Sequence, residues 1–499
     1  MQYFDETTFT MIPERNFSPK TMFLKLLRAG VVVMMFSTLF PEFLYGQKYD
    51  PAGLITGEEA SRLLSEYIRH PSVSGNEKNA GEYFAGICRE KGLTIKILSD
   101  DSARYNFTAS LYPLDLNKPN IVFLNHIDVV NEGDTSVWIH PPFSGAIIND
   151  TVWGRGAIDM KGVAIMQLLA TSSISALARQ NDLPVNVTLL CVSGEENYGV
   201  NGAEYVCDTW YTTLNPAVVI GEGGIGSKNM LTRFPEKLIF AISLSDKRAV
   251  WIKLHLNYKA SGHGAIPPPE YACKMMIKAL SSLTQTNPSI HFNDVTTNML
   301  KSYGKMEKGL KGFLIQHPRF FKPIIAGGLR KNPIILSTLT NTLTLTHIEN
   351  GVKCINQIPQ EISAYLDCRL LPETSTDDFL EYLRKKIGNN NIVINVIKES
   401  KNAPPTKPDI CYTLFGKSLA ETYPGAGLFP VLFPATTDNN YFRAKGVPVY
   451  GFIPAVLNEE QMQTVHNYNE RIAVNSLVLG AKTYSRFLEM ILMQDDFLK

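Results

Sequence analysis

The sequence predicts an α/β fold in which helices flank a mostly parallel sheet and a smaller α+β domain is inserted into the main domain. The first observation is that short apolar runs, typical of strands buried on both faces, recur between segments with helical periodicity. The second is that apolar and polar residues alternate in the middle of the chain, as in strands with one face in water. At 499 residues the chain is long enough for at least two domains with sizeable cores.

The main domain is expected on both sides of the insertion. Its strands are predicted from four apolar runs, at residues 120–125, 185–193, 216–221 and 447–452. Helical periodicity covers much of residues 54–92, then 159–180, and again 473–492. Because the apolar runs lie between helices, we expect their strands to run in parallel within one buried sheet.

The inserted domain is predicted from strand-like alternation and one helical segment. The alternating segments are residues 251–260, 341–351 and 361–372, and the helical segment is 270–283. The predicted boundaries are 1–46 for an N-terminal extension with a signal peptide, 47–245 and 372–499 for the two parts of the main domain, and 246–371 for the insertion.

Within the insertion, residues 301–332 have an unusual composition. They carry eight Lys or Arg and one Glu, interleaved with the apolar groups FLI, FF and II. A solvated helical segment with one apolar side is the expected structure. Contact with a membrane surface and a pocket for an acyl chain are the alternatives.

The overall composition is that of an ordinary globular protein. The 48 basic and 47 acidic residues nearly balance, which argues against a nucleic-acid partner. The seven cysteines show no CxxC spacing and are expected to be buried thiols, with room for one disulfide if the chain is exported. Any metal site should therefore use histidine and carboxylate ligands.

The N-terminal region contains a predicted export signal. Residues 22–47 have a basic start, an apolar stretch of signal-peptide length and small or turn residues before Gln47. Pro41 and Glu42 interrupt the stretch and make it short for a bilayer span. We expect cleavage, a secreted or periplasmic protein and no integral membrane segment in the mature chain. An uncleaved membrane anchor and a buried helix are the alternatives.

Charged residues follow the predicted strands of the main domain. His126 and Asp128 come after one strand, Glu195 and Glu196 after the next, and Glu222 after a third. Ligands of open α/β sheets gather at the carboxyl ends of the strands. Burying adjacent carboxylates without cations costs about several kcal/mol each, so this grouping indicates a metal site.

Asp159 lies in the glycine-rich segment GRGAIDMKG, before a predicted helix. The glycines resemble a dinucleotide fingerprint, but the third glycine is missing. Helix capping is one role for Asp159, and bridging two cations such as zinc is another. With cations present, one of the adjacent glutamates 195 and 196 could bind metal while the other stays free as a general base.

Eight motifs in this order carry a resemblance to a known family: HID, GRGAIDMKG, SGEEN, GEGG, ASGHGAIPP, NQIP with DCRLLP, TTDNNYF and VHNYNERI. From about Glu58 onward the chain resembles the dinuclear-zinc aminoacylase and carboxypeptidase family, which includes glutamate carboxypeptidase, acetylornithine deacetylase and succinyl-diaminopimelate desuccinylase. It is most similar to the carboxypeptidase S branch with its secreted N-acyl-amino-acid hydrolases. The resemblance implies a zinc-aminopeptidase-like catalytic domain and makes the insertion a lid and dimerisation domain.

The resemblance also implies a metal centre with two zinc ions per subunit, for which Co²⁺ or Mn²⁺ could substitute. His126 and Glu222 would bind one ion, Glu196 and His466 would bind the other, and Asp159 would bridge them.

Two further residues receive roles at this centre from the resemblance. Asp128 would orient the His126 imidazole. Glu195 would be the general base that takes a proton from the attacking water and delivers it to the leaving nitrogen.

The resemblance assigns substrate contacts mainly to the insertion. His263 would stabilise the oxyanion, often across a homodimer. Asn356 would bind the carbonyl and Arg369 the free carboxylate, although a structural salt bridge is an equal alternative for Arg369. Asp438 falls on a motif near the metal site, and Asn440 stands where relatives often have Arg.

The predicted activity is zinc-dependent hydrolysis of an amide next to a free α-carboxylate, in a small-molecule substrate of the Gly-X dipeptide kind. The alternative is an aminoacylase-like deacylase of N-acyl amino acids, including long-chain ones. A catalytically silent binding protein is disfavoured because every expected ligand and the base are present.

Overall fold

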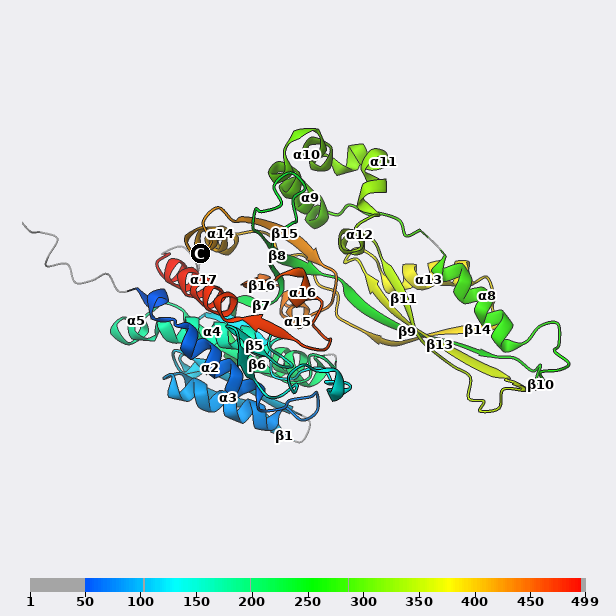
Figure 1. Cartoon of the computed structure of the whole chain (residues 1–499), viewed down its shortest axis with the longest axis horizontal. Coiled ribbons are helices and arrows are strands. Elements are labelled where there is room, and N and C mark those ends of the chain that lie inside the picture. The colour runs from blue at the N-terminus through cyan, green and yellow to red at the C-terminus, as the bar shows by residue number, and fades with distance from the viewer. Residues whose placement is uncertain (1–49, 102–103, 198, 286, 495–499) are drawn as a thin grey trace, which may run out of the picture. The chain divides into compact units, whose positions relative to one another are not determined.

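The computed structural model describes residues 50–101, 104–197, 199–285 and 287–494. The predicted N-terminal extension and signal peptide lie outside the described residues. From Pro51 onward the chain forms one compact unit, whose elements carry the labels of Figure 1.

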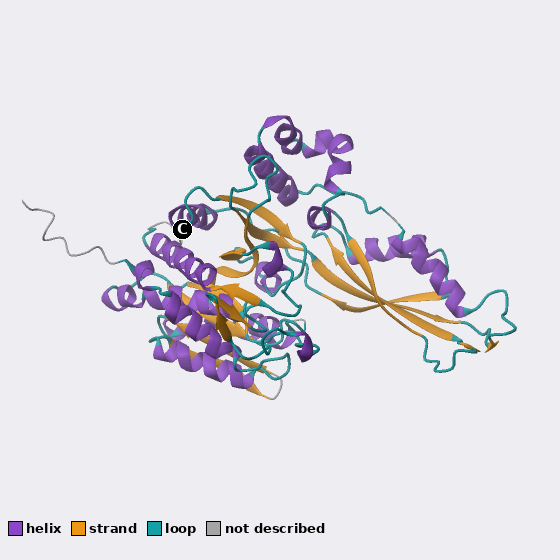
Figure 2. Cartoon of the chain, viewed as in Figure 1, coloured by secondary structure: helices purple, strands orange, loops and turns teal. Residues whose placement is uncertain are grey.

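Among the described residues, the largest sheet has eight strands in the order β1-β2-β6-β3-β7-β16-β8-β15 (Figures 1 and 2). The strands are β1 (Thr94–Asp101), β2 (Arg104–Ser110), β3 (Asn120–His126), β6 (Asn186–Val192), β7 (Pro216–Ser227), β8 (Ile239–Asp246), β15 (Gly427–Phe433) and β16 (Val449–Val456). The pairs β6–β3, β3–β7, β7–β16 and β8–β15 are parallel, and antiparallel pairing occurs toward the two edges. The predicted mostly parallel sheet is confirmed.

Helices cover both faces of this sheet. The larger apolar core contains residues of α2 (Gly57–Ile68), α3 (Lys78–Glu90), α4 (Lys161–Ser173), α14 (Ile410–Thr422) and α17 (Val474–Leu492). A second core contains residues of α6 (Tyr205–Thr209), α7 (Tyr211–Leu214) and α15 (Asn439–Ala444). Burial on both faces explains why β3 and β6 appear in the sequence as continuous apolar runs.

Among the described residues, one helical stretch, Lys161–Gln180, is long and apolar enough to cross a membrane. It comprises α4 and α5 (Ser175–Gln180), and most of it is buried inside the protein. Its apolar composition is therefore accounted for by packing against α17 and the sheet.

The inserted domain contains a four-stranded sheet in the order β11-β13-β9-β14. Its strands are β9 (Arg248–Asn257), β11 (Thr342–Glu349), β13 (Glu361–Leu370) and β14 (Ile392–Glu399), and its helices α8 (Ala272–Thr284) and α13 (Thr376–Ile387) share one apolar core with the sheet. The short strands β10 (Gly262–His263) and β12 (Gln357–Ile358) pair beyond one end of this sheet.

The structure extends the inserted domain past the boundary predicted at residue 371. β14 pairs with β9 along the edge opposite β13, and α13 packs against α8. Phe379, Leu383 and Ile387 of α13 are buried in the core of this domain. The insertion therefore ends near residue 399.

The helical segment within the insertion packs elsewhere. It comprises α9 (Asp294–Glu307), α10 (Gly309–Gln316), α11 (Pro318–Leu329) and α12 (Pro333–Leu339). Its inner side shares an apolar core with Ile239 of β8 and Phe429 of β15, which belong to the eight-stranded sheet. The expected helical segment with one packed apolar side is present.

A small three-stranded sheet and several short segments complete the fold. The sheet pairs β17 (Arg471–Ala473), β5 (Thr151–Trp153) and β4 (Ala146–Ile148) in that order. The short helical segments are η1 (Pro51–Leu54), η2 (Leu114–Leu116), η3 (Thr135–Val137), the π-type η4 (Val200–Glu204) and α16 (Glu459–Met462).

Candidate metal centre

Three neighbouring strands bring histidine and carboxylates to one edge of the sheet. His126 ends β3 and pairs with Val192 at the end of parallel β6, so the turn with Glu195 and Glu196 follows at the same edge. Glu222 was expected after its strand but lies within β7, because β7 continues and pairs with β8 at Gly226. These side chains meet because β3 pairs with both β6 and β7.

Asp159 and His466 are brought together by the small sheet. Trp153 of β5 pairs with Arg471 of β17, so the loop that follows β5 lies beside the loop that precedes β17. Asp159 is in the first loop and His466 in the second. His466 has a positive φ of 57°, an uncommon conformation for a residue other than glycine.

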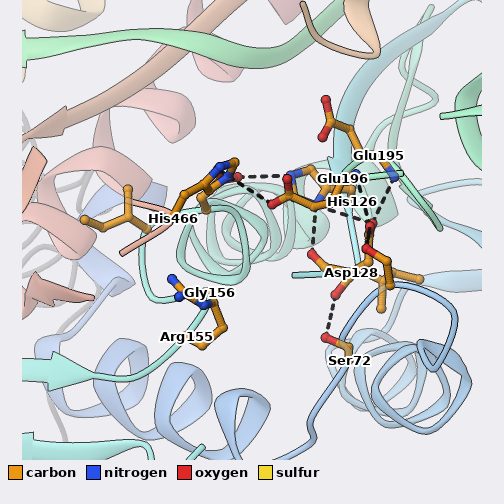
Figure 3. A network of polar contacts seen from close by, with 12 residues as sticks. Ser72, His126, Asp128, Arg155, Gly156, Glu195, Glu196 and His466 are labelled. Carbon is orange, nitrogen blue, oxygen red and sulfur yellow. Dashed lines mark hydrogen bonds and ion pairs between the residues drawn. The ribbon is translucent and has the colours of Figure 1, made fainter. Parts of the chain in front are cut away.

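The two histidines contact the two oxygens of one carboxylate. Nε2 of His126 lies 3.0 Å from Oδ1 of Asp159, and Nε2 of His466 lies 2.9 Å from Oδ2. The same nitrogen of His466 is 3.1 Å from Oε1 of Glu196. Figure 3 shows the Glu196 side chain turned toward His466. Asp159 therefore has the geometry of a bridge between two ligand groups.

Two overlapping sets of ligand atoms meet at His126. His126, Asp159 and Glu196 offer atoms that all lie within 4.8 Å of one another, and so do His126, Glu195 and Glu222. The adjacent glutamates thus belong to different sets, and Figure 3 shows the Glu195 carboxylate pointing away from that of Glu196.

Asp128 fixes the turn that carries both glutamates. Its carboxylate accepts hydrogen bonds from the backbone N–H groups of Glu195 and Glu196, each at 3.1 Å, and from the Ser74 hydroxyl at 2.7 Å. Nδ1 of His126 is 2.9 Å from the Asp128 carbonyl oxygen but 3.6 Å from its carboxylate. The structure therefore orients the imidazole through the backbone of Asp128 and leaves the carboxylate to position the turn.

Burial raises the pKa of several carboxyls at this edge. It raises the pKa of Glu195 well above the usual value, opposed by His126 and reinforced by Glu222. It also raises the pKa of Glu222 in the same direction, and that of Asp438 to about 7. These shifts indicate more buried negative charge than the protein neutralises, so the residues fit divalent cations.

In His466 the surroundings favour the charged form of the side chain, whereas burial favours the neutral form of the carboxyls. Hydrogen bonds with Asp159 and Glu196 raise the pKa of His466 to about 10. In this arrangement the protonated imidazole occupies the position of a cation between two carboxylates. A metal ion bound there would require the neutral imidazole.

Arg155 and Glu470 were not predicted as site residues, yet they hold the loop of Asp159. The Glu470 carboxylate is buried and accepts hydrogen bonds from the backbone N–H groups of Gly156 at 2.9 Å, Ile158 at 2.8 Å and Asp159 at 3.1 Å. Arg155 Nη1 donates to the same carboxylate at 2.8 Å. The one signal in the sequence is the position of Glu470 four residues after His466, in HNYNER.

The remaining predicted residues fall into two groups. His263 and Asn356 lie together on the inserted domain, with 3.3 Å between His263 Nε2 and Asn356 Nδ2. Arg369, also on that domain, makes a bidentate ion pair with Asp367 at 2.7 and 3.0 Å, which is the structural alternative for this residue.

Asp438, by contrast, lies in the main domain at the start of α15. It packs so closely on Gly199, after the glutamate turn, that a Cβ at Gly199 would be 2.3 Å from Asp438 Oδ1. Asn440 accepts a hydrogen bond from Arg443 at 2.6 Å, and Arg443 is paired with Asp246 at 3.2 Å. All seven cysteines are described and free, so the disulfide that the sequence left open is absent.

The fold and this site define a metal-dependent hydrolase with a helix-flanked, mostly parallel sheet. The chain belongs to peptidase family M20/M25/M40, whose sequence model matches residues 122–490. It is 27% identical to "Probable carboxypeptidase S-like 2" of Dictyostelium discoideum over 77% of this chain and 73% of that protein. It is 25% identical to "N-fatty-acyl-amino acid synthase/hydrolase PM20D1" of Homo sapiens over 71% of this chain and 70% of that protein.

Among solved structures, the chain is similar to the M20 family metallo-carboxypeptidase Sso-CP2 from Sulfolobus solfataricus. The TM-score is 0.66 at 21% identity, with 87% of this chain and 100% of that chain covered. This likeness supports the same fold.

We predict that Glu470→Gln lowers metal affinity roughly 10- to 100-fold, as loss of a residue that positions metal ligands does. The substitution removes the charge that holds Arg155 and the loop of Asp159. Titration with metal and elemental analysis measure the change. The control is Glu460→Gln, since Glu460 is exposed and pairs with Arg471 in the same part of the chain. Equal metal affinity in the two variants would contradict the assigned role.

Proposed function

We propose that the protein is a dinuclear zinc amidohydrolase that cleaves an amide bond next to a free α-carboxylate. The observation that carries this proposal is the pair of overlapping ligand sets, with Asp159 in contact with a histidine on each side. His126 and Glu222 would hold one ion, Glu196 and His466 the other, and Asp159 both. When bound, the ions would polarise the amide carbonyl and lower the pKa of the attacking water.

Glu195 is the proposed general base. Its backbone N–H is fixed by Asp128, and its carboxyl lies near His126 and Glu222 rather than beside His466. This position suits a group that takes a proton from water and returns it to the leaving nitrogen. Glu196 is assigned as the ligand because it faces His466 at 3.1 Å.

Gly-X dipeptides are the leading substrate class, and N-acyl amino acids are the second. Sequence similarity does not choose between the two classes. The chain is 27% identical to a carboxypeptidase S-like protein and 25% identical to an N-fatty-acyl-amino acid synthase/hydrolase. Both substrate classes share an amide next to a free carboxylate. This shared group is what the proposed function requires.

Export is proposed from the sequence of residues 22–47, with cleavage near Gln47 and membrane anchoring as the alternative. The mature enzyme would then act in the periplasm or outside the cell.

His263 is proposed to act on a second copy of the chain. β9 leaves the main domain at Arg248 and has ten residues, which span roughly 33 Å before the segment with His263. Nε2 of His263 lies near the Asn356 amide and its Nδ1 accepts a hydrogen bond from the Ala265 N–H, at this far end of the strand. A dimer would let this end reach the partner's metal centre.

We predict that Glu195→Gln keeps both ions and lowers the rate of hydrolysis about 10²- to 10⁴-fold, the usual contribution of a general base. The matched variant Glu196→Gln should lose metal, because Glu196 is assigned as a ligand. Elemental analysis and turnover separate the two effects. Metal loss in Glu195→Gln with full occupancy in Glu196→Gln would mean that the two roles are exchanged.

The substrate prediction is tested with Gly-Leu, N-acetyl-leucine and a long-chain N-acyl-leucine, each compared with its C-terminal carboxamide. We expect hydrolysis of at least one free acid, strong loss with its carboxamide and loss after chelation, with products detected by mass. The carboxamide keeps the scissile amide but lacks the charge to be recognised. Equal turnover of acid and carboxamide would contradict recognition of the carboxylate.

The dimer prediction is tested by mixing His263→Ala with Glu195→Gln, each of which should be inactive alone. If His263 serves the partner's centre, a mixed dimer has one intact site, and random pairing restores about a quarter of the activity. The control mixture, Glu195→Gln with Glu196→Gln, has both defects in the same centre and should stay inactive. Mixed dimers without recovered activity would contradict action across the dimer.

A further inference from the structure

The outer side of α10 and α11 exposes large apolar side chains. Leu310 is 74% exposed, Phe313 51%, Phe320 80% and Ile324 65%. We call these four residues the apolar ridge. Single exposed apolar side chains are ordinary, whereas a contiguous group of them indicates an interaction surface.

The apolar ridge is continuous across the two helices. The Phe321 ring lies between its neighbours, 5.8 Å from the Phe313 ring and 4.7 Å from the Phe320 ring, centroid to centroid. Leu310 is one turn before Phe313 on α10. Ile324 is four residues after Phe320 on α11, which is kinked at Phe321. Figure 1 shows α9, α10 and α11 as one cluster, and contacts join all three pairs.

The ridge is not the side that holds these helices on the protein. Met299, Leu300, Ile315 and Leu329 are buried in the core shared with β8 and β15. The cluster is therefore apolar on two sides, and folding of the chain uses only the inner one. Internal packing explains the inner side and leaves the ridge to be explained.

Basic side chains accompany the ridge. Residues 301–332 contain eight of the 48 basic residues and one of the 47 acidic residues. That acidic residue, Glu307, is buried and accepts the backbone N–H of Thr232 at 2.9 Å.

Three of these basic residues form the basic row at the C-terminal end of α9. Lys301 and Lys305 are one helical turn apart on α9, and Lys308 is the residue that follows its last turn. All three are exposed and have no acidic partner among the described residues. The net charge of the whole chain is only +1, so this excess of positive charge is local.

We propose that the apolar ridge and the basic row dock the enzyme on the surface of an anionic phospholipid bilayer. The lysines would lie at the lipid phosphates, and Phe313, Phe320 and the two aliphatic side chains would enter the boundary between headgroups and acyl chains. Charge complementarity selects this occupant, because lysines and exposed aromatic and aliphatic side chains on one helical cluster match an interface that is negative outside and apolar beneath. The docking is independent of the proposed substrate.

The test uses the chain from Gln47 onward, which contains the whole compact unit and lacks the apolar N-terminal segment. Sedimentation is measured with vesicles of phosphatidylcholine alone and of phosphatidylcholine mixed with phosphatidylglycerol. We expect binding to the anionic vesicles that weakens as salt is raised. No binding to anionic vesicles, or equal binding to both kinds, would overturn the proposal.

Two variants test the two parts of the surface. Phe313→Ser/Phe320→Ser and Lys301→Glu/Lys305→Glu/Lys308→Glu should each weaken vesicle binding at least about tenfold, since several buried groups or charges are lost at once. Thermal melting and metal content should stay as in the parent chain, which separates docking from folding. Unchanged vesicle binding in both variants overturns the proposal.

A matched control comes from α8 of the inserted domain. Ile277 is 63% exposed there, with exposed Lys274 and Lys278 beside it. The variant Lys274→Glu/Ile277→Ser/Lys278→Glu should bind vesicles as the parent does. If it loses as much binding as the ridge and row variants, general charge and not this surface is responsible. Binding of monomeric long-chain fatty acid without vesicle binding would overturn docking in favour of an acyl-chain pocket.

Discussion

The burial of negative charge at one end of the central sheet is the constraint on which the rest of the site depends. An unpaired buried carboxylate costs about several kcal/mol. The protein offsets part of this cost with backbone donors. The Asp128 carboxylate accepts hydrogen bonds from two backbone N–H groups of the turn that carries Glu195 and Glu196. The Glu470 carboxylate accepts three from the loop of Asp159. Burial still raises the pKa of Glu195 and Glu222, whose side chains meet at His126.

The hydrogen bonds of Asp128 to the backbone explain why Glu195 and Glu196 can be adjacent. Asp128 holds the backbone of both, so the turn is fixed before either side chain is used. Consecutive residues of such a turn point in different directions, and Glu196 reaches His466 while Glu195 joins His126 and Glu222. The two glutamates, although adjacent in the sequence, therefore reach different parts of the site. The carboxylate of Asp128 is more important for this than for the imidazole of His126.

The sequence could predict the part of the site that depends on long strands. β3, β6 and the first half of β7 are apolar runs. The rule that carboxyl ends of parallel strands share an edge brings His126 and Glu196 together, and Glu222 lies within β7 where its apolar run ends. His466 and Glu470 depend instead on the pairing of β5 with β17, two strands of three residues each and some 300 residues apart. Strands this short have no periodicity to detect. The family resemblance assigned His466, and the one signal for Glu470 was its position four residues after His466.

The domain boundary was missed for a related reason. Phe379, Leu383 and Ile387 recur at helical spacing, which predicts a helix with an apolar stripe. An apolar stripe does not show which sheet the helix packs on, because both the eight-stranded and the four-stranded sheet are covered by helices. Only the pairing of β14 with β9 assigns α13 to the inserted domain. Local pattern can thus indicate such a helix, whereas the domain to which the helix belongs depends on contacts distant in sequence.

The two ends of the inserted sheet constrain how a small substrate could be bound. Arg369 pairs with Ala249, near the main domain, whereas Glu361 at the other end of β13 pairs with Asn257. These two positions are eight residues apart, or roughly 26 Å along the strand. His263 and Asn356 lie beyond the far end, so one chain cannot bring Arg369 and this pair to the same dipeptide-sized molecule. Asp367 engages the Arg369 guanidinium on two nitrogens, which is the salt-bridge alternative for Arg369. His263 and Asn356 are the part of the insertion that we propose acts on a second copy of the chain.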